Sequence, residues 1–377
     1  MVLYVLLLTT FLGSFFLSLF VFHFGPKLGF QDVPNERSSH REPVARGGGF
    51  GIFLNFTFGL VVLKLMGVVS FNYLLGLLVG GTLTFLVGLG DDRWSLPARA
   101  RLVVHFVAAL WTMIFITQGL GGNYKIDIGI AELSGVFLCG AFSILFISWM
   151  INLYNFIDGI DGQAGAIGFV VAALLGGLAY WQGYSNYELY FIYASAIFGF
   201  LIVNWYPAKV FMGDCGSGFL GFIFAVMALL GEFRGGLPLL ATVMLLSPII
   251  VDATYTLIVR VLLGHRPYEP HREFLFQRFI QKGWPPPRLV LSGVLAILVW
   301  NLPLTVASLL WPQHSALFLV ATYAPYTLLA WQKKAGYPIH SQIVKAANER
   351  LLKKSLHLHS LDFSEEANKN NTRPLEL

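Results

Sequence analysis

Long apolar runs recur from one end of the chain to the other, and they restrict the fold more than any other feature. The runs are close to 20 residues long, which is enough for a helix to cross the hydrocarbon core of a bilayer. Of the 377 residues, 56% are apolar and 12% are charged. That charge content is about half the share found in soluble domains. The chain is therefore an integral membrane protein, and its backbone should cross the membrane as helices.

About eleven membrane-spanning helices are predicted from these runs. Their expected ranges are 2–24, 47–66, 71–90, 102–119, 133–152, 163–182, 187–205, 217–233, 236–262, 288–310 and 315–331. The first range lacks a basic segment before it and is too long for a cleaved signal, so it should remain in the mature protein. The predicted fold is an all-α polytopic membrane domain over 1–334. A cytoplasmic tail follows over 335–377, with a short amphipathic helix near 343–352 and a disordered end.

The distribution of basic residues predicts the orientation. Of the 25 Lys and Arg, 21 fall in the tail and in alternate connecting segments, which the positive-inside rule places in the cytoplasm. The N-terminus is then outside and the C-terminus inside. The net charge of +5 follows mostly from this topology and from attraction to anionic lipid headgroups. Because the basic residues are spread over separate loops, nucleic acid is not an expected partner. Cys139 and Cys215 offer no disulfide framework.

The third inner segment carries amides and carboxylates at every third position, in Asn152-Leu-Tyr-Asn-Phe-Ile-Asp-Gly-Ile-Asp-Gly162. If a helix continued through it, Asn152, Asn155 and Asp158 would share one face. Oxygen-bearing groups that converge at a membrane boundary suggest a hard cation and a phosphate-rich ligand. The alternative is a helix end followed by a polar turn, since Asn, Asp and Gly all favour turns.

Other inner segments carry groups of the same kind. Asp91 and Asp92 end the third span, and adjacent helical residues point about 100° apart, so at most one should face a shared ligand. A glycine-rich turn follows Arg46, and it either holds a phosphate or permits close packing of the second span. Asp214 begins the eighth span, where a carboxylate is favoured whether or not it also binds a metal. Several such segments on one face favour a common site.

The fifth inner segment and the ninth span complete the polar set. The segment places His271 and Arg272 beside Phe274. It is either an interfacial amphipathic segment or a cationic wall for a diphosphate with aromatic residues against an apolar tail. Asp252 lies midway along the ninth span. Intramembrane carboxylates are rare and often functional, although a structural pairing between helices would explain this one equally well.

These motifs together resemble the polyprenyl-phosphate N-acetylhexosamine-1-phosphate transferases of glycosyltransferase family 4. The resemblance runs from about Asp32 to Arg278 and is most specific in 152–162 and in Val210-Phe-Met-Gly-Asp214. The Asp91–Asp92 pair and the segment from Pro34-Asn-Glu-Arg-Ser-Ser-His40 to Gly49 agree with it. The chain is similar to the bacterial branch that starts O-antigen or related glycan assembly.

The resemblance and the residue chemistry together imply a complete site. The catalytic pair is Asp91 and Asp92, and the ligands for Mg²⁺ (or Mn²⁺) are Asn155 and Asp214. The substrate-binding residues are Asn152, Asp158, Asp161, Arg46, His271 and Arg272. Relatives usually carry a His in the fifth loop at the position that corresponds to Phe274 in this chain. The role of that His therefore either passes to His271 or is absent.

The expected reaction moves N-acetylhexosamine-1-phosphate from a UDP-N-acetylhexosamine to undecaprenyl phosphate and releases UMP, in a bacterial inner membrane. The undecaprenyl carrier follows only from the bacterial character of the branch. Direct attack by the carrier phosphate and a route through an aspartyl intermediate both remain open, as does a homodimer.

Two alternatives belong to other classes of protein. A secondary transporter would account for Asp252 and the many spans, but transporters usually bind near the midplane between repeated halves. Here the carboxylates gather at one surface, and no repeat is visible. An inactive scaffold of the glycan assembly machinery is the third interpretation.

Overall fold

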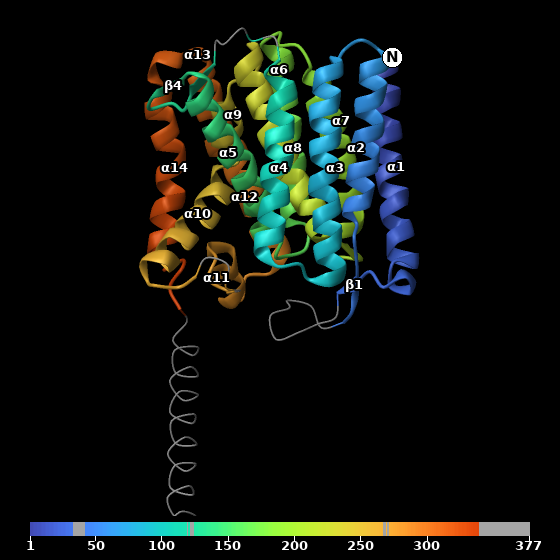
Figure 1. The fold of residues 1–377 in the computed structure, drawn as a ribbon. Coiled ribbons are helices and arrows are strands. Elements are labelled where there is room, and N and C mark those ends of the chain that lie inside the picture. Colours follow the sequence, from blue (N-terminus) through green and yellow to red (C-terminus); the bar gives the residue numbers. More distant parts are fainter. Residues whose placement is uncertain (33–41, 119, 121–123, 267–268, 270, 339–377) are drawn as a thin grey trace, which may run out of the picture.

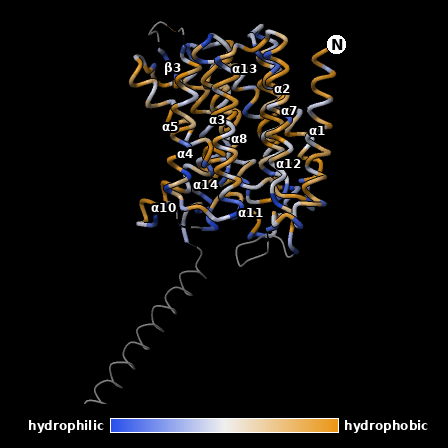
Figure 2. Tube along the Cα trace, turned by 45° about the vertical axis from the view of Figure 1, so that its right-hand side comes forward, coloured by the Kyte–Doolittle hydropathy of each residue, from blue (hydrophilic) through white to orange (hydrophobic). Residues whose placement is uncertain are grey.

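The chain forms one bundle of helices that run roughly side by side (Figure 1). The computed structural model describes all residues except 33–41, 119, 121–123, 267–268, 270 and 339–377. Apolar positions extend along the helices and hydrophilic ones gather near their ends (Figure 2). In the described part, eight helical segments are long and apolar enough to cross a membrane. They are α1 (Val2–Phe24), α3 (Phe71–Trp94), α4 (Ala98–Ile116), α5 (Val136–Ile157), α6 (Gln163–Trp181), α7 (Tyr187–Asn204), α8 (Gly213–Arg234) and the run Pro286–Leu310.

All eleven predicted ranges are helical over most of their length, so the all-α polytopic prediction is confirmed. The run 286–310 consists of α12 (Pro286–Ala296), a π-helical stretch (Ile297–Asn301) and α13 (Leu302–Leu310). Two of the predicted spans, α2 (Gly49–Leu65) and α14 (Ser315–Gln332), lie outside the eight. The first has only 17 residues, and the second has 18 residues but a lower mean hydropathy than the eight.

The predicted span 236–262 is not one straight helix. It divides into α9 (Leu239–Leu245) and α10 (Ser247–Leu262), which are bent by 76° relative to each other. Pro248 lies in the first turn of α10. Proline has no N–H and cannot continue the hydrogen-bond ladder of α9, yet it is tolerated in the first turn of a new helix. Counted as one span, this pair raises the number of candidate spans to nine.

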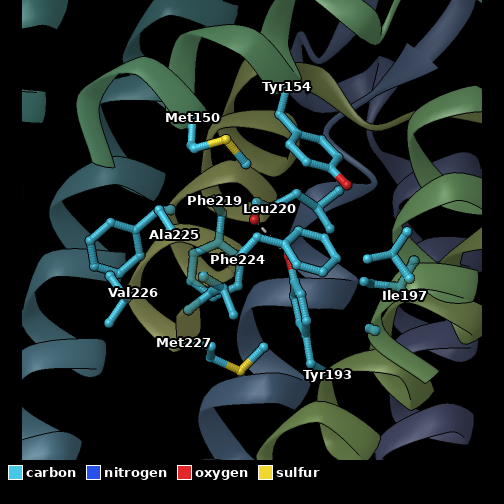
Figure 3. Packing of buried hydrophobic residues seen from close by; sticks show 14 of the residues in the cluster. Met150, Tyr154, Tyr193, Ile197, Phe219, Leu220, Phe224, Ala225, Val226 and Met227 are labelled. Atoms are coloured by element: carbon cyan, nitrogen blue, oxygen red, sulfur yellow. Dashed lines mark hydrogen bonds between the residues drawn. The ribbon is translucent and has the colours of Figure 1, made fainter. Parts of the chain in front are cut away.

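Helix α8 lies at the centre of the bundle. It is the most buried of the eight segments, with 89% of its most apolar 18 residues inside the bundle. It packs against α3 and α5. Aromatic side chains fill the space around it (Figure 3). Tyr154 of α5 stacks on Phe224 with ring centroids 5.5 Å apart, and the Tyr193 hydroxyl donates to the Leu220 carbonyl over 2.8 Å. This close packing holds α8 in place, including its first residues.

A small sheet ties the first inner segment to the start of α8. Strand β2 (Val44–Arg46) pairs antiparallel with β1 (Gln31–Asp32) and parallel with β5 (Val210–Phe211), with Arg46 opposite Phe211. The three glycines after β2 donate their N–H groups to the carbonyls of Phe211 and Met212. A Cβ at Gly49 would lie 2.4 Å from the Gly216 Cα. The glycine-rich turn therefore serves close packing, because its N–H groups are already bonded and not open to a phosphate.

The remaining elements lie at the two ends of the bundle. We call the end where α3 and α5 finish and α8 begins the site face. The short helix α11 (Leu275–Gln281) lies at this face, toward the bottom of Figure 1. The hairpin of β3 (Lys125–Asp127) and β4 (Glu132–Ser134) lies at the opposite end.

Candidate active site

Three carboxylates from two helices meet at the site face. Asp91 and Asp92 lie in the last turn of α3, and Asp214 is the second residue of α8. Arg46, at the end of β2, joins the two helices because its Nη2 lies 2.8 Å from Asp92 Oδ1 and 2.7 Å from Asp214 Oδ1. The parallel pairing of β2 with β5 places Arg46 there, since β5 leads directly into α8.

The two adjacent aspartates point in different directions, as the 100° step along a helix requires. Asp92 has a side chain that is 1% exposed, and its oxygens accept the backbone N–H groups of Asp214 and Cys215 over 2.8 and 3.1 Å. It therefore caps the first turn of α8 from a neighbouring helix. Asp91 turns instead toward Arg101 of α4, with which it forms an ion pair. At Gly213, where φ is +77°, a Cβ would lie 2.5 Å from Asp92 Oδ2.

Arg101 was not among the residues predicted for the site. Its Nη1 bonds to Asp91 and lies 3.4 Å from Asp214 Oδ2. With Arg46 it gives two guanidinium groups against three carboxylates, so the cluster keeps a net negative charge. One sequence signal could have identified it. Arg101 follows Arg99 near the start of α4, where the helix dipole disfavours a cation unless carboxylates lie nearby.

Asn155 and Asp214 line the same small cavity, of about 30 Å³. The Asn155 amide nitrogen donates to Ser217 Oγ over 3.3 Å, which leaves the amide oxygen for another partner. A carboxylate and an amide oxygen suit Mg²⁺, which usually keeps several waters and substrate phosphates as its other ligands. Among the described residues, no three His, Cys, Asp or Glu are grouped to hold a metal. The donors fit an ion completed by substrate, not one enclosed by protein.

The amide–carboxylate motif divides at the end of α5. Asn152 and Asn155 lie on the helix and line the small cavity. Asp158 follows the last helical residue, with φ −75° and ψ 54°, so the prediction that it shares a helical face with the two amides is wrong, because the turn begins there. Burial, with the nearby charge of Asp214, raises the pKa of Asp158 from 3.8 to about 7. Asp161 turns to the next loop and accepts the Ala208 N–H over 2.9 Å.

An apolar groove of about 730 Å³ opens beside the small cavity. Its walls come from α4, α5, α10 and the segment before α11. It shares Arg101, Asn152 and Phe156 with the small cavity, so the two spaces adjoin. The other lining residues are Ala98, Arg99, Leu102, Phe106, Leu145, Ser148, Trp149, Leu257, Glu269, His271 and Phe274.

The fifth inner segment forms the rim of this groove. His271 and Phe274 both line it, with ring centroids 4.5 Å apart. Burial and the nearby Arg260 lower the pKa of His271 to about 4, so its ring is neutral at pH 7. Its Nδ1 accepts the Glu273 N–H over 3.3 Å. Arg272 adjoins His271, and its carbonyl accepts the Gln281 amide over 2.9 Å. The predicted cationic wall thus contains a neutral His271.

Asp252 has a structural partner. Its carboxylate is buried on α10 and accepts the N–H groups of Leu275 and Phe276 over 2.6 and 3.0 Å. It therefore caps α11, and Arg260, two turns further along α10, forms a buried ion pair with Glu273. Of the two interpretations of this residue, structural pairing is correct. This removes the main observation that favoured a transporter.

The Pro34–His40 part of the resemblance lies outside the described residues.

Fold and site together define the class, which is a polytopic membrane protein with a carboxylate-rich site at one face, open to an apolar groove between helices. A model of glycosyl transferase family 4 matches residues 74–232, from α3 to α8. The undecaprenyl-phosphate alpha-N-acetylglucosaminyl 1-phosphate transferase of Escherichia coli (strain K12) is 28% identical over 273 residues, which cover 68% of this chain and 71% of that protein. The decaprenyl-phosphate N-acetylglucosaminephosphotransferase of Mycobacterium tuberculosis (strain ATCC 25618 / H37Rv) is 27% identical over 306 residues, with 70% and 72% covered. Residues 74–232 are thus similar to glycosyl transferase family 4, and the two relatives extend the similarity to about 70% of the chain.

Proposed function

We propose that the protein transfers an N-acetylhexosamine-1-phosphate from a UDP-sugar to undecaprenyl phosphate and releases UMP. The observation that carries the proposal is the junction of two unlike spaces. A small polar cavity lined by Asn155 and Asp214 adjoins a large apolar groove, and the two share Arg101, Asn152 and Phe156. A phosphate on a long apolar chain needs both kinds of surface. The names of the relatives, which describe transfer to polyprenyl phosphates, support the same acceptor class.

The acceptor lies with the first part of its tail in the groove and the rest in the bilayer. Leu102, Phe106 and Trp149 contribute apolar walls, and burying such surface contributes roughly 25 cal/mol per Å². The phosphate then lies at the junction, beside the Arg101 guanidinium. This places it next to the carboxylate cluster without exposing the tail to water.

The donor diphosphate occupies the polar side of the junction. Asn155 and Asp214 would hold Mg²⁺, which when bound supplies neutralising charge to the diphosphate. Arg46 and Arg101 bring two further positive charges next to Asp214. Asp92 holds the first turn of α8 and so fixes the position of the Asp214 carboxylate. Phosphoryl transfer depends mainly on such positioning and on electrostatic stabilisation.

In the reaction, an oxygen of the carrier phosphate attacks the β-phosphorus of the UDP-sugar. The bond from that phosphorus to the bridging oxygen breaks, and UMP leaves with this oxygen. Asp91, with a side chain 10% exposed, is more open than Asp92, and it is the member of the pair that can take a proton from the incoming phosphate. Both oxygens of Asp92 already accept backbone hydrogens, which argues against Asp92 as a covalent nucleophile.

The site face is assigned to the cytoplasm of a bacterial inner membrane, with the N-terminus outside. The excess of Lys and Arg in the segments of this face supports the orientation, and the UDP-sugar is a cytoplasmic metabolite class. The product would be the first intermediate of a lipid-linked, O-antigen-like glycan.

The test is UMP release by the full chain in detergent, with Mg²⁺, undecaprenyl phosphate and a panel of UDP-N-acetylhexosamines. Release that requires both the metal and the lipid supports the proposal, and the best sugar identifies the donor. Undecaprenol, which lacks the phosphate, is the matched control and should give no release. No lipid-dependent release with any sugar, from protein that retains its helical circular dichroism, would overturn it in favour of the scaffold.

A further inference from the structure

His105 is a buried residue of the site that the function above does not use. It lies on α4, one turn beyond Arg101, and is 7% exposed. It lines the small cavity together with Asn155 and Asp214. Leu102 and Phe106, on the same helix, line the apolar groove. The imidazole therefore lies where the polar cavity and the groove meet.

The hydrogen bonds of Asn152 determine which nitrogen of this ring carries the proton. The Asn152 Nδ2 group donates one hydrogen to the Ser148 carbonyl over 2.7 Å, which fixes the orientation of the amide. The same Nδ2 lies 3.3 Å from His105 Nδ1. An amide nitrogen only donates, so His105 Nδ1 must accept. The neutral ring then carries its proton on Nε2, which has no hydrogen bond to any described residue.

We propose that His105 is a binding residue for the acceptor phosphate, to which it donates a hydrogen bond from Nε2. This inference rests on the proposed function, whose acceptor is a polyprenyl phosphate. Arg101 supplies the charge for that phosphate, and His105 supplies a neutral, directional donor. A positive charge on the His105 ring itself is disfavoured because the Arg101 guanidinium lies one turn away.

The acceptor fits this position better than the donor does. His105 lies on α4 between two residues that line the tail groove, whereas the two residues assigned to the metal, Asn155 and Asp214, come from α5 and α8. A phosphate held by Arg101 and His105 is attached to a chain that runs along Leu102 and Phe106. The same placement sets the attacking phosphate oxygen next to Asp91, because the Arg101 guanidinium that would bind the phosphate also forms an ion pair with Asp91.

The test compares His105→Leu with His105→Gln in the UMP-release assay. The leucine variant loses the donor, and its KM for undecaprenyl phosphate should rise about ten- to a hundredfold, as expected for the loss of a hydrogen bond to a charged group. Its KM for the UDP-sugar should change less than about twofold. The glutamine variant keeps an N–H donor at a similar reach and should recover most of the affinity for the acceptor.

A spectroscopic measurement separates binding from a structural role. In ¹⁵N-histidine-labelled protein, the His105 signals should show protonated Nε2 and unprotonated Nδ1. Undecaprenyl phosphate should shift the Nε2 signal in the absence of nucleotide, and undecaprenol should not. The inference is overturned if the leucine variant keeps its acceptor KM, if both KM values rise together, or if the proton lies on Nδ1. Absence of UMP release by the wild-type protein would instead contradict the proposed function, and the lipid-dependent shift would still test His105.

Discussion

At the scale of single residues, Asp214 is where the contacts of the site converge. Its two oxygens face Arg46 and Arg101, and its N–H is held by Asp92. Its position also depends on Gly213, whose positive φ a side chain would strain. A carboxylate held in this way by its neighbours is oriented before substrate arrives, which is the condition for effective electrostatic stabilisation.

Replacing Asp214 with Asn should reduce turnover by at least about a hundredfold, as for the removal of one preorganised charged group. The amide keeps the shape but loses the negative charge that faces the two guanidinium groups. The measurement is UMP release, with the melting temperature as a check on folding. Asp127→Asn is the matched control, because Asp127 lies in the hairpin at the opposite end of the bundle. Full activity in Asp214→Asn would contradict the metal assignment.

The second residue-scale prediction concerns the pH dependence of stability through Asp158. Its pKa is raised from 3.8 to about 7 in the folded protein, so the native state retains a proton that the unfolded state has lost. The stabilising contribution is complete below about pH 4 and disappears as the pH rises through 7. The melting temperature of protein kept free of divalent cations should therefore fall between pH 5 and pH 8.

Asp158→Asn isolates this effect because an amide does not titrate. The decrease in melting temperature between pH 5 and pH 8 should be smaller in the variant than in the wild-type protein. Equal pH profiles for the two proteins would show that Asp158 ionises near its usual pKa. Asp127→Asn, at the opposite end of the bundle, serves again as the control for substitution of an aspartate by asparagine.

At the scale of elements, α10 and α11 are joined by a buried polar anchor. The Asp252 carboxylate caps α11, and Arg260 pairs with Glu273, whose side chain is 5% exposed. These bonds hold the segment that carries His271 and Phe274 at the rim of the groove. A buried charge is tolerated here because two backbone donors and a hydroxyl surround it.

Asp252→Asn should loosen α11, because an amide has a single acceptor oxygen for two N–H donors and turns its own donor toward one of them. The docked position of α11 should lose about 1–3 kcal/mol of stability. The readouts are faster tryptic cleavage after Arg272 or Arg278 and a lower melting temperature. Thr254→Ala is the matched control, since Thr254 lies on the same helix and its hydroxyl has no partner among the described residues. Unchanged cleavage in Asp252→Asn would show that the cap does not hold the segment.

At the scale of the whole molecule, the groove exists because α10 diverges from the axis of the bundle. The 76° bend after α9 directs α10 obliquely toward the site face (Figure 1). Its far end, with α4 and α5, then encloses an apolar space that reaches the carboxylate cluster. This arrangement fits the proposed function, in which the lipid acceptor enters from the bilayer and the nucleotide donor from the aqueous side.

Leu102→Trp should narrow this groove without touching the carboxylates. The KM for undecaprenyl phosphate should rise about five- to a hundredfold, equivalent to about 1–3 kcal/mol of steric cost. The KM for the UDP-sugar should stay the same. Leu110→Trp is the control, because Leu110 is 51% exposed on the same helix and lies outside the groove lining. Equal effects of the two substitutions would place the acceptor elsewhere.

The sequence alone was enough to predict the class of fold and the gathering of the polar groups at one end of the helices. Apolar runs of bilayer length leave a helix as the way to satisfy the backbone in lipid, so all eleven predicted ranges are helical. The motifs around Asp91, Asn155 and Asp214 were singled out because they resemble those of a known family and because their oxygen-bearing side chains suit a hard cation and phosphate. Their meeting in one site was predictable from topology alone.

What each polar residue contacts depends on the tertiary fold. Asp92, Asp161 and Asp252 all bind backbone N–H groups of another segment, a role that no local pattern distinguishes from catalysis. Arg101 and His105 entered the site because α4 packs between α3 and α5. The physical reason is that a carboxylate has the same local signature whether its partner is a metal, a substrate or a helix end, and the partner comes from residues distant along the chain.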